Sequence, residues 1–259
     1  MRACYWTAVA ALAALAGPVL AEPGVALPRV AYVKDPAGRL RPLHGVAGTF
    51  LLGAPALSGV RAFSAWGEEA AAVVDSRVLF FRNGRPVREL PAPGGRAVLG
   101  LDQQGEPAAV VFPEAASAAF RTREGWKSLP VRLPEGTILA AATEARGAVL
   151  VLAVRRPGGL WVIHQLAGRG LLLRQEWVAP NVSAACLLPG RTLLYAVEDR
   201  LVAQGPSGER ATVPAGGEVK TLEPAGRGWI QIHFADGRSR IARIGADDIQ
   251  VFHIPEAAR

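Results

Sequence analysis

The chain has 259 residues, 50% of them hydrophobic, and a formal net charge of +7. A chain of this size and apolar content buries about 70% of its unfolded surface without cross-links, which excludes a small disulfide-held scaffold. Only three of its 29 basic residues are lysines, and the arginines are spread along the chain instead of lying on one stripe with aromatics, which excludes a nucleic-acid-binding tract.

The N-terminal segment is predicted to be a secretory signal peptide, residues 1–21. It has one basic residue, Arg2, then an Ala/Leu/Val stretch, and then Val19 and Ala21, which are small enough for the signal-peptidase pocket. The stretch is shorter than the about 20 residues that a membrane span needs. A retained anchor is the alternative. We expect cleavage after Ala21, no membrane span, and an exported chain in the periplasm or outside the cell.

Two kinds of side chain are predicted to be buried. Cys186 is the only cysteine after the signal peptide, so no internal disulfide forms. It lies in the apolar run "SAACLLPG" without a basic neighbour, which indicates a structural thiol and not a nucleophile. The tryptophans near strand ends or within strands are expected to pack between sheets: Trp66, Trp126, Trp161, Trp177 and Trp229.

From residue 60 onward the pattern is that of short strands. Apolar runs alternate with Gly, Pro, Asp and Asn, and none is long enough for a periodic helix. In "WIQIHF", residues 229–234, the side chains alternate with period two. The runs fall into groups of four about every 40 residues, which predicts five four-stranded units. These units cover residues 60–95, 97–136, 137–181, 182–217 and 218–256.

Four short strands about every 40 residues is the spacing of a β-propeller blade, because stacking blades in a ring covers the apolar faces of each sheet. Residues 29–53 align by eye with residues 77–100, since both begin Arg-Val and end Leu-Gly. This predicts the second half of a blade, short or composite, that closes the ring by pairing with residues 218–256. We therefore expect a single β-propeller domain over residues 22–259, with about six blades, or five. A β-sandwich or a β-helix array is the alternative.

In period and strand count, residues 29–256 resemble β-propellers of the broad WD40, NHL and YVTN kind. The Gly-His and Trp-Asp dipeptides of the WD40 family are absent, as is a YVTN-type tetrapeptide. Because no family motif matches, no functional residue is carried over. The resemblance implies an exported propeller that binds proteins, glycans or small ligands, and some propellers of this kind are hydrolases or lactonases.

No local motif nominates a catalytic residue, a metal site or a cofactor. The four histidines, His44, His164, His233 and His253, do not share a local metal-ligand spacing. Nucleophile-elbow, phosphate-loop and dinucleotide motifs are absent. A pair of carboxylates that meets only in space would leave no such motif, so a hydrolase acting on a glycan or an ester stays open as the alternative function.

Candidate binding residues lie in the turns between the second and third strands of three units. The segments "VVDSRVL", "AVEDRLV" and "HFADGRSRI" each place an Asp before an Arg. Asp also begins tight turns for purely structural reasons. In a ring, however, equivalent turns lie on one face and can form a polar rim, so we expect a protein or glycan partner there and a non-enzymatic binding or scaffold role in the envelope. The candidate residues are Asp75, Arg77, Asp199, Arg200, Asp236 and Arg238.

Overall fold

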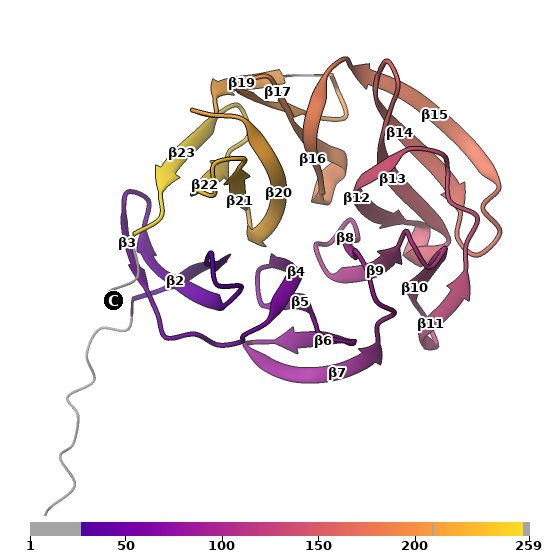
Figure 1. The fold of residues 1–259 in the computed structure, drawn as a ribbon, viewed down its shortest axis with the longest axis horizontal. Helices are drawn as coiled ribbons and strands as arrows, with labels where there is room; N and C mark the ends of the chain where they lie inside the picture. Colours follow the sequence, from indigo (N-terminus) through magenta and orange to yellow (C-terminus); the bar gives the residue numbers. More distant parts are fainter. Residues whose placement is uncertain (1–26, 209, 256–259) are drawn as a thin grey trace, which may run out of the picture.

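Strands alone build the ring in Figure 1. The structure, a computed structural model, describes residues 27–208 and 210–255, and within these ranges it has 23 β-strands and two single-turn 3-10 segments. No helix in this part of the chain is long and apolar enough to cross a membrane. The prediction of an all-β chain is confirmed, and the predicted signal peptide lies outside the described residues.

Five blades match the five predicted units, and each contains four consecutive antiparallel strands. The second blade has β4 (Val60–Trp66), β5 (Glu69–Val74), β6 (Arg77–Arg82) and β7 (Arg85–Pro91), and the third has β8 (Val98–Leu101), β9 (Pro107–Phe112), β10 (Ser117–Thr122) and β11 (Gly125–Pro130). The fourth has β12 (Thr137–Glu144), β13 (Val149–Arg156), β14 (Gly159–Leu166) and β15 (Leu172–Ala179). The fifth has β16 (Val182–Leu188), β17 (Thr192–Val197), β18 (Arg200–Gln204) and β19 (Arg210–Pro214). The sixth has β20 (Val219–Gly226), β21 (Trp229–Phe234), β22 (Ser239–Ile244) and β23 (Ile249–His253). The β-propeller prediction is therefore confirmed over a sandwich or a β-helix array.

In each of these five blades the first strand lies nearest the axis and the fourth lies at the rim (Figure 1). We call the disc face with the turns between second and third strands the upper face, and the face with the turns between first and second strands the lower face. Toward the lower face, β4 pairs with β20 and β8 pairs with β12, both in parallel. A Cβ atom on Gly100 of β8 would lie 3.0 Å from the backbone of Ala141, so glycine permits this approach.

The first blade is short and, within the described residues, has no strand at the axis. It contains β1 (Arg29–Lys34), β2 (Leu40–Val46) and β3 (Thr49–Leu52), which form a sheet of their own. The predicted strand pairing of residues 29–53 with residues 218–256 is therefore wrong. The physical reason is that β20, the inner strand of the sixth blade, already pairs with β4. The first blade instead closes the ring as a wedge between these two blades.

Apolar packing holds this wedge in place. Phe50 of β3 meets the ring of Trp229 edge-on, with the ring centroids 5.6 Å apart. Ala31 and Leu43 belong to the same buried cluster as Trp229. A Cβ atom on Gly226 would lie 2.5 Å from the carbonyl oxygen of Val30, so β1 approaches the backbone of β20 more closely than any side chain there would allow. Residues 29–53 thus lie at the closure of the ring, as expected. They contact the sixth blade by side-chain and backbone packing, however, and not by strand pairing.

Of the side chains predicted to be buried, two are buried, three tryptophans are partly buried against core clusters (Trp66, Trp126 and Trp161), and one is exposed. Cys186 is buried, and its burial raises the pKa of the thiol. The thiol therefore stays protonated, in agreement with a structural cysteine. Trp229 is buried, and Trp126 packs against Phe80 with the ring centroids 4.4 Å apart. The exposed side chain is that of Trp177 on the rim strand β15, at 52%. Its expected place between two blades is wrong, because the side chain lies on the outermost strand of its blade, where the indole N–H donates to the carbonyl oxygen of Gly158.

Candidate functional site

A funnel of about 200 Å³ opens on the upper face at the axis. The inner strands of the five complete blades line it, together with the end of β1. The strand pairings β4–β20 and β8–β12 lie toward the other end of the axis, so the inner strands approach one another there. Most of the lining is apolar, and the polar and charged side chains in it are Lys34, Arg61, Arg96, Thr221 and Glu223.

Lys34 occupies the place that an inner strand of the first blade would fill. Its Nζ atom lies 2.8 Å from Glu223 Oε1 of β20 and donates to the carbonyl oxygen of Arg61 of β4 at 3.3 Å. The ammonium group also lies over the ring of Phe63, 5.9 Å from its centroid. The Lys34 side chain therefore bridges β20 and β4. None of the described strands of the first blade lies between these two inner strands.

Glu223 continues this contact into a chain of hydrogen bonds. Its Oε2 lies 2.9 Å from His233 Nε2, and His233 Nδ1 lies 3.0 Å from Ser239 Oγ. Because a carboxylate only accepts, Nε2 carries the proton and Nδ1 is free to accept from the serine hydroxyl. Burial raises the pKa of Glu223, but the hydrogen bond from His233 and the charge of Lys34 outweigh this effect and hold the pKa below its usual value. Glu223 is therefore ionised at neutral pH.

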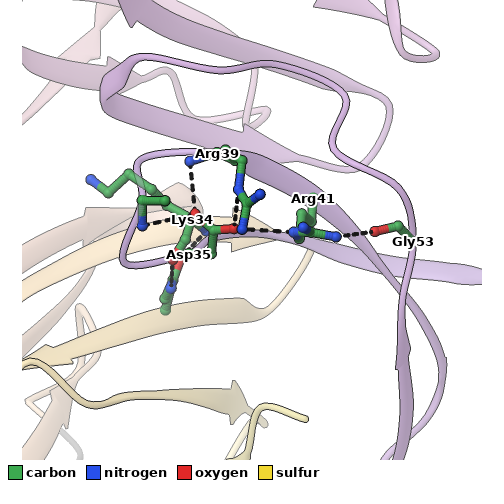
Figure 2. A network of polar contacts seen from close by, with 7 residues as sticks. Lys34, Asp35, Arg39, Arg41 and Gly53 are labelled. Atoms are coloured by element: carbon green, nitrogen blue, oxygen red, sulfur yellow. Dashed lines mark hydrogen bonds and ion pairs between the residues drawn. The ribbon is translucent and has the colours of Figure 1, made fainter. Parts of the chain in front are cut away.

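A second network fixes the β1–β2 turn and with it the position of Lys34 (Figure 2). Asp35 Oδ2 accepts from Arg39 Nε at 2.8 Å and from Arg41 Nε at 3.1 Å, and Arg41 in turn donates to the carbonyl oxygen of Gly53. Burial raises the pKa of Asp35, but the hydrogen bonds from Arg39 and Arg41 lower it by more. The backbone of Lys34 is held by the buried amide of Gln231, with both hydrogen bonds at 2.7 Å.

The six residues predicted to bind do lie in equivalent turns on the upper face, in the second, fifth and sixth blades. The side chains of Arg77, Asp236 and Arg238 make contacts within their own blades. Asp236 accepts from the backbone and the guanidinium of Arg238, and Arg77 lies 3.5 Å from Glu89 of the neighbouring strand. Asp75 has a positive φ of 49°, which a turn Asp tolerates. None of the contacts among the described residues joins one of these three turns to another, so the turns surround the funnel as separate groups.

A second hollow, of about 530 Å³, lies toward the lower face between the fourth and fifth blades. Glu144 at its edge lies 3.0 Å from Arg191 Nε and 3.7 Å from His164 Nδ1. Burial lowers the pKa of His164; Glu144 raises it, and Arg174 and Arg191 lower it further. Two buried polar atoms lining the hollow have no hydrogen-bond partner among the described residues: Thr143 Oγ1 and Gln204 Oε1.

The chemistry that the funnel allows is narrower than the chemistry that the sequence left open. Among the described residues, no three His, Cys, Asp or Glu side chains are grouped as metal ligands. The described lining of the funnel contains one carboxylate, Glu223, where hydrolysis by two carboxylates needs a pair about 5 to 9.5 Å apart. What the funnel does offer is a set of cationic groups and the serine–histidine–glutamate chain beside it.

The sequence analysis missed Lys34, Glu223, His233 and Ser239. A signal for part of this set was available, because the hairpin of β20 and β21 pairs Thr221 with His233 and so brings Glu223 diagonally beside the histidine. No local signal exists for Lys34, which lies 189 residues from Glu223.

No protein-family model matches the sequence, and no curated protein matches it. Solved structures with a similar fold include PorZ of Porphyromonas gingivalis, described as an essential bacterial surface component of the type-IX secretion system, with 11% identity and a TM-score of 0.45. That similarity covers 91% of this chain but 39% of PorZ, so the chain spans well under half of its length. Hsv2 of Kluyveromyces lactis has 8% identity and a TM-score of 0.41 over 88% of this chain and 100% of its own. A functionally unknown protein from Desulfotomaculum acetoxidans has 10% identity and a TM-score of 0.45 over 86% of both chains. These likenesses concern the fold alone.

Proposed function

We propose that the protein is an exported, non-enzymatic β-propeller that acts as a binding module in the cell envelope or outside the cell. Its partner is a protein or a glycan that approaches the upper face and places a carboxylate or another anionic group in the funnel. The observation that carries this proposal is the charge of the funnel. Three cationic side chains and one carboxylate line it, and that carboxylate already pairs with Lys34 and His233.

The two arginines of the funnel are placed to receive an anion. Arg61 donates to the carbonyl oxygens of Gly95 and Asp75, which fixes its guanidinium at the mouth. Arg96 lines the funnel with its side chain exposed, so an anion that enters the funnel can contact it directly. Charge-assisted hydrogen bonds between arginine and an anion are stronger than those between neutral groups.

The rigid scaffold explains why a partner would meet this face. Turns on a repeat scaffold carry chemistry without disturbing the packing of the blades. The funnel has room for one acidic side chain or one sugar acid, and the surrounding turns, including those with Asp75, Asp199 and Asp236, would contact the rest of the partner.

The experiment compares carboxylate-bearing probes with a neutral one. A glutamate-rich peptide and an oligogalacturonate serve as protein and glycan probes, and a glutamine-rich peptide of the same length is the control. Calorimetry at low salt should detect binding of an acidic probe, and Arg96→Gln should weaken it about tenfold, the value of one charged hydrogen bond. Arg123→Gln, on an exposed turn of the lower face, should leave it unchanged. Equal binding of the acidic and neutral probes, or full binding by Arg96→Gln, would contradict the proposal.

A hydrolase acting on an ester is the second candidate, and the chain Ser239–His233–Glu223 favours it. A serine bonded to a histidine that a carboxylate orients is the arrangement of an activated nucleophile. Ser239 Oγ would attack the ester carbonyl while His233 Nδ1 takes its proton and passes it to the departing alkoxide, and water would then release the acyl group. Labelling by a fluorophosphonate probe that Ser239→Ala abolishes and the exposed control Ser128→Ala retains would support this candidate, and an unlabelled wild-type protein would remove it.

Export is part of the proposal. N-terminal sequencing of the protein recovered from the periplasm or the medium of its host should begin at Glu22. A recovered chain that still begins before Ala21 would show a retained segment instead.

A further inference from the structure

The rim strand β15 has a surface unlike that of the other outer strands. Residues 171–177 are all exposed, as residues 82–89 around β7 are, but here more of the exposed side chains are large and apolar. Four of the nine exposed large hydrophobic side chains among the described residues lie here, each 50% to 59% exposed: Leu171, Leu172, Leu173 and Trp177. Exposed apolar side chains gathered in one segment mark an interaction site more often than chance.

The exposure follows from a difference in strand length. β14 and β15 have eight residues each, whereas β18 and β19 of the neighbouring fifth blade have five. The fifth blade therefore leaves the lower half of β15 uncovered, and the hollow between the fourth and fifth blades lies there. On the other side, β10 and β11 of the third blade have six residues each.

The edge of β15 is also unprotected. The strand pairs with β14 alone among the described strands, so one row of its backbone N–H and C=O groups faces outward. Other rim strands carry prolines or are short, which blocks further pairing. β7 contains Pro86 and Pro91, β11 ends at Pro130 and β19 at Pro214, while β3 and β23 have four and five residues. β15 has no proline and no lysine, and it is regular from Arg174 to Trp177, between bulges at Leu173 and Val178.

The order of the side chains on this edge is self-complementary. About Gln175, the neighbours Arg174 and Glu176 have opposite charges, and the next residues out, Leu173 and Trp177, are both large and apolar. When two copies of the strand pair antiparallel with Gln175 opposite Gln175, Arg174 lies opposite Glu176 in both directions. Centring the pairing on Arg174 or on Glu176 would oppose like charges instead, so this register is selected.

We propose that β15 is a dimerisation edge at which a second copy of this chain adds its own β15 in antiparallel register about Gln175. Arg174 and Glu176 of one strand form an ion pair with each other in the single chain, which shows that they lie on the same side of the strand. In the dimer each of them pairs across the two-fold axis. The rim position of β15 lets two discs approach edge to edge (Figure 1) and leaves the funnel on the upper face open. The two eight-stranded sheets that end at β15 then become one continuous sheet.

The test is a charge exchange followed by sedimentation of the full chain. The wild-type protein should dimerise in analytical ultracentrifugation. Arg174→Glu and Glu176→Arg should each weaken the dimer roughly tenfold to thirtyfold, because two cross-strand pairs change from opposite to like charge. The doubly exchanged variant, Arg174→Glu with Glu176→Arg, should dimerise again, and an equimolar mixture of the two single variants should form a heterodimer. A control, Arg88→Glu on the exposed part of β7, should leave the wild-type association unchanged.

Three outcomes would overturn the proposal. The wild-type protein could remain monomeric at about 100 μM, where a specific strand-paired dimer should form. The dimer could persist in both single variants, which would place the contact elsewhere. The single variants could fail to associate when mixed although each has the melting temperature and circular dichroism of the wild type, which would show that Arg174 and Glu176 do not face each other.

Discussion

The seam between the first and sixth blades is filled, whereas the seam between the fourth and fifth blades is hollow. At the first seam none of the described strands takes the inner position, yet Lys34 reaches between β20 and β4 and contacts Glu223. At the second seam every strand is present, but two of them are shorter than their neighbours, and a hollow of about 530 Å³ remains. Thr143 and Gln204 each keep a buried oxygen there without a partner among the described residues.

The difference between the two seams indicates that a ring of sheets compensates for a missing strand better than for a short one. A missing strand brings the two flanking blades together, so one long side chain and an apolar wedge suffice to close the gap. A short strand does not bring its neighbours closer, because the blade still occupies its place in the ring. The uncovered surface then remains on the longer neighbour, here β15, and becomes available to other molecules.

The largest expected effect comes from removing the filled seam altogether. Deletion of residues 28–56 would expose the apolar cluster that contains Trp229, Ile241 and Phe63, and would uncover the space beside Lys34's partner Glu223. We expect aggregation and not a mild loss of stability, because an open apolar face associates with other copies. Size-exclusion chromatography with light scattering would measure it. A soluble monomer that melts cooperatively would show that the first blade is dispensable for closure.

The two seams should also differ when one carboxylate is removed from each. Glu223→Ala leaves Lys34 and His233 without their partner in a largely buried place, and we expect a loss of about 2 to 4 kcal/mol in the free energy of unfolding. Glu144→Ala at the hollow seam releases Arg191, which is mostly exposed, and should cost about 1 kcal/mol or less. Urea unfolding of both variants would measure the two costs. Equal losses would mean that the filled seam is no more tightly coupled than the hollow one.

The arrangement of blades was predictable because each hairpin has its own local signal. The turn between β6 and β7 is an example: Asn83 and Gly84 both have positive φ, as the tight hairpin turn favoured by Asn-Gly requires. The three-stranded wedge was not predictable in detail, because whether β20 pairs with β4 or with the first blade depends on the whole ring. The same holds for Trp177, which has the apolar character of a core residue but lies on the outermost strand of its blade and is exposed.

The candidate site was predictable only in part, for a related reason. The turns with Asp75, Asp199 and Asp236 repeat along the sequence, so their common face follows from the repeat alone. The funnel combines Lys34 with Glu223, 189 residues away, and no periodicity relates the two. A residue with a role in only one blade leaves no repeated pattern in the sequence. Lys34 and Glu223, which line the funnel, are residues of this kind.

The seams should respond to different ranges of pH. The folded pKa of His164 lies below its usual value, with Glu144, Arg174 and Arg191 facing it, so the unfolded chain binds the proton more readily. Stability is therefore lost as the pH falls below about 6.5, and His164→Asn should remove that part of the loss. The pKa of Glu223 is also lowered, so its contribution is present above the unfolded pKa of about 4.3 and is lost only as the pH falls further, through the folded pKa.

Melting temperatures measured between pH 7 and pH 3 for the wild type, His164→Asn and Glu223→Gln would separate the two ranges. We expect the curve of His164→Asn to be flatter between about pH 6.5 and pH 5, and that of Glu223→Gln to be flatter below about pH 4.5. If His164→Asn and the wild type have the same slope over the higher range, the titration of His164 does not affect the hollow seam.

The smallest expected effect on stability lies in the turns that neither seam contains. Replacing Arg77, Arg200 and Arg238 together by Ala should shift the melting temperature by only a few degrees. Arg77 and Arg238 are half exposed and pair with carboxylates of their own blade, and such pairs contribute about 1 kcal/mol or less each.

If the turns are also the rim of the binding face, the same variant should lose the partner that the wild-type protein recovers from the envelope of its host. Its far-ultraviolet circular dichroism should stay that of the wild type, so that lost binding is not lost folding. A variant that melts much earlier but still binds its partner per folded molecule would show that these arginines serve the turns alone, and the funnel would then remain as the binding element of the upper face.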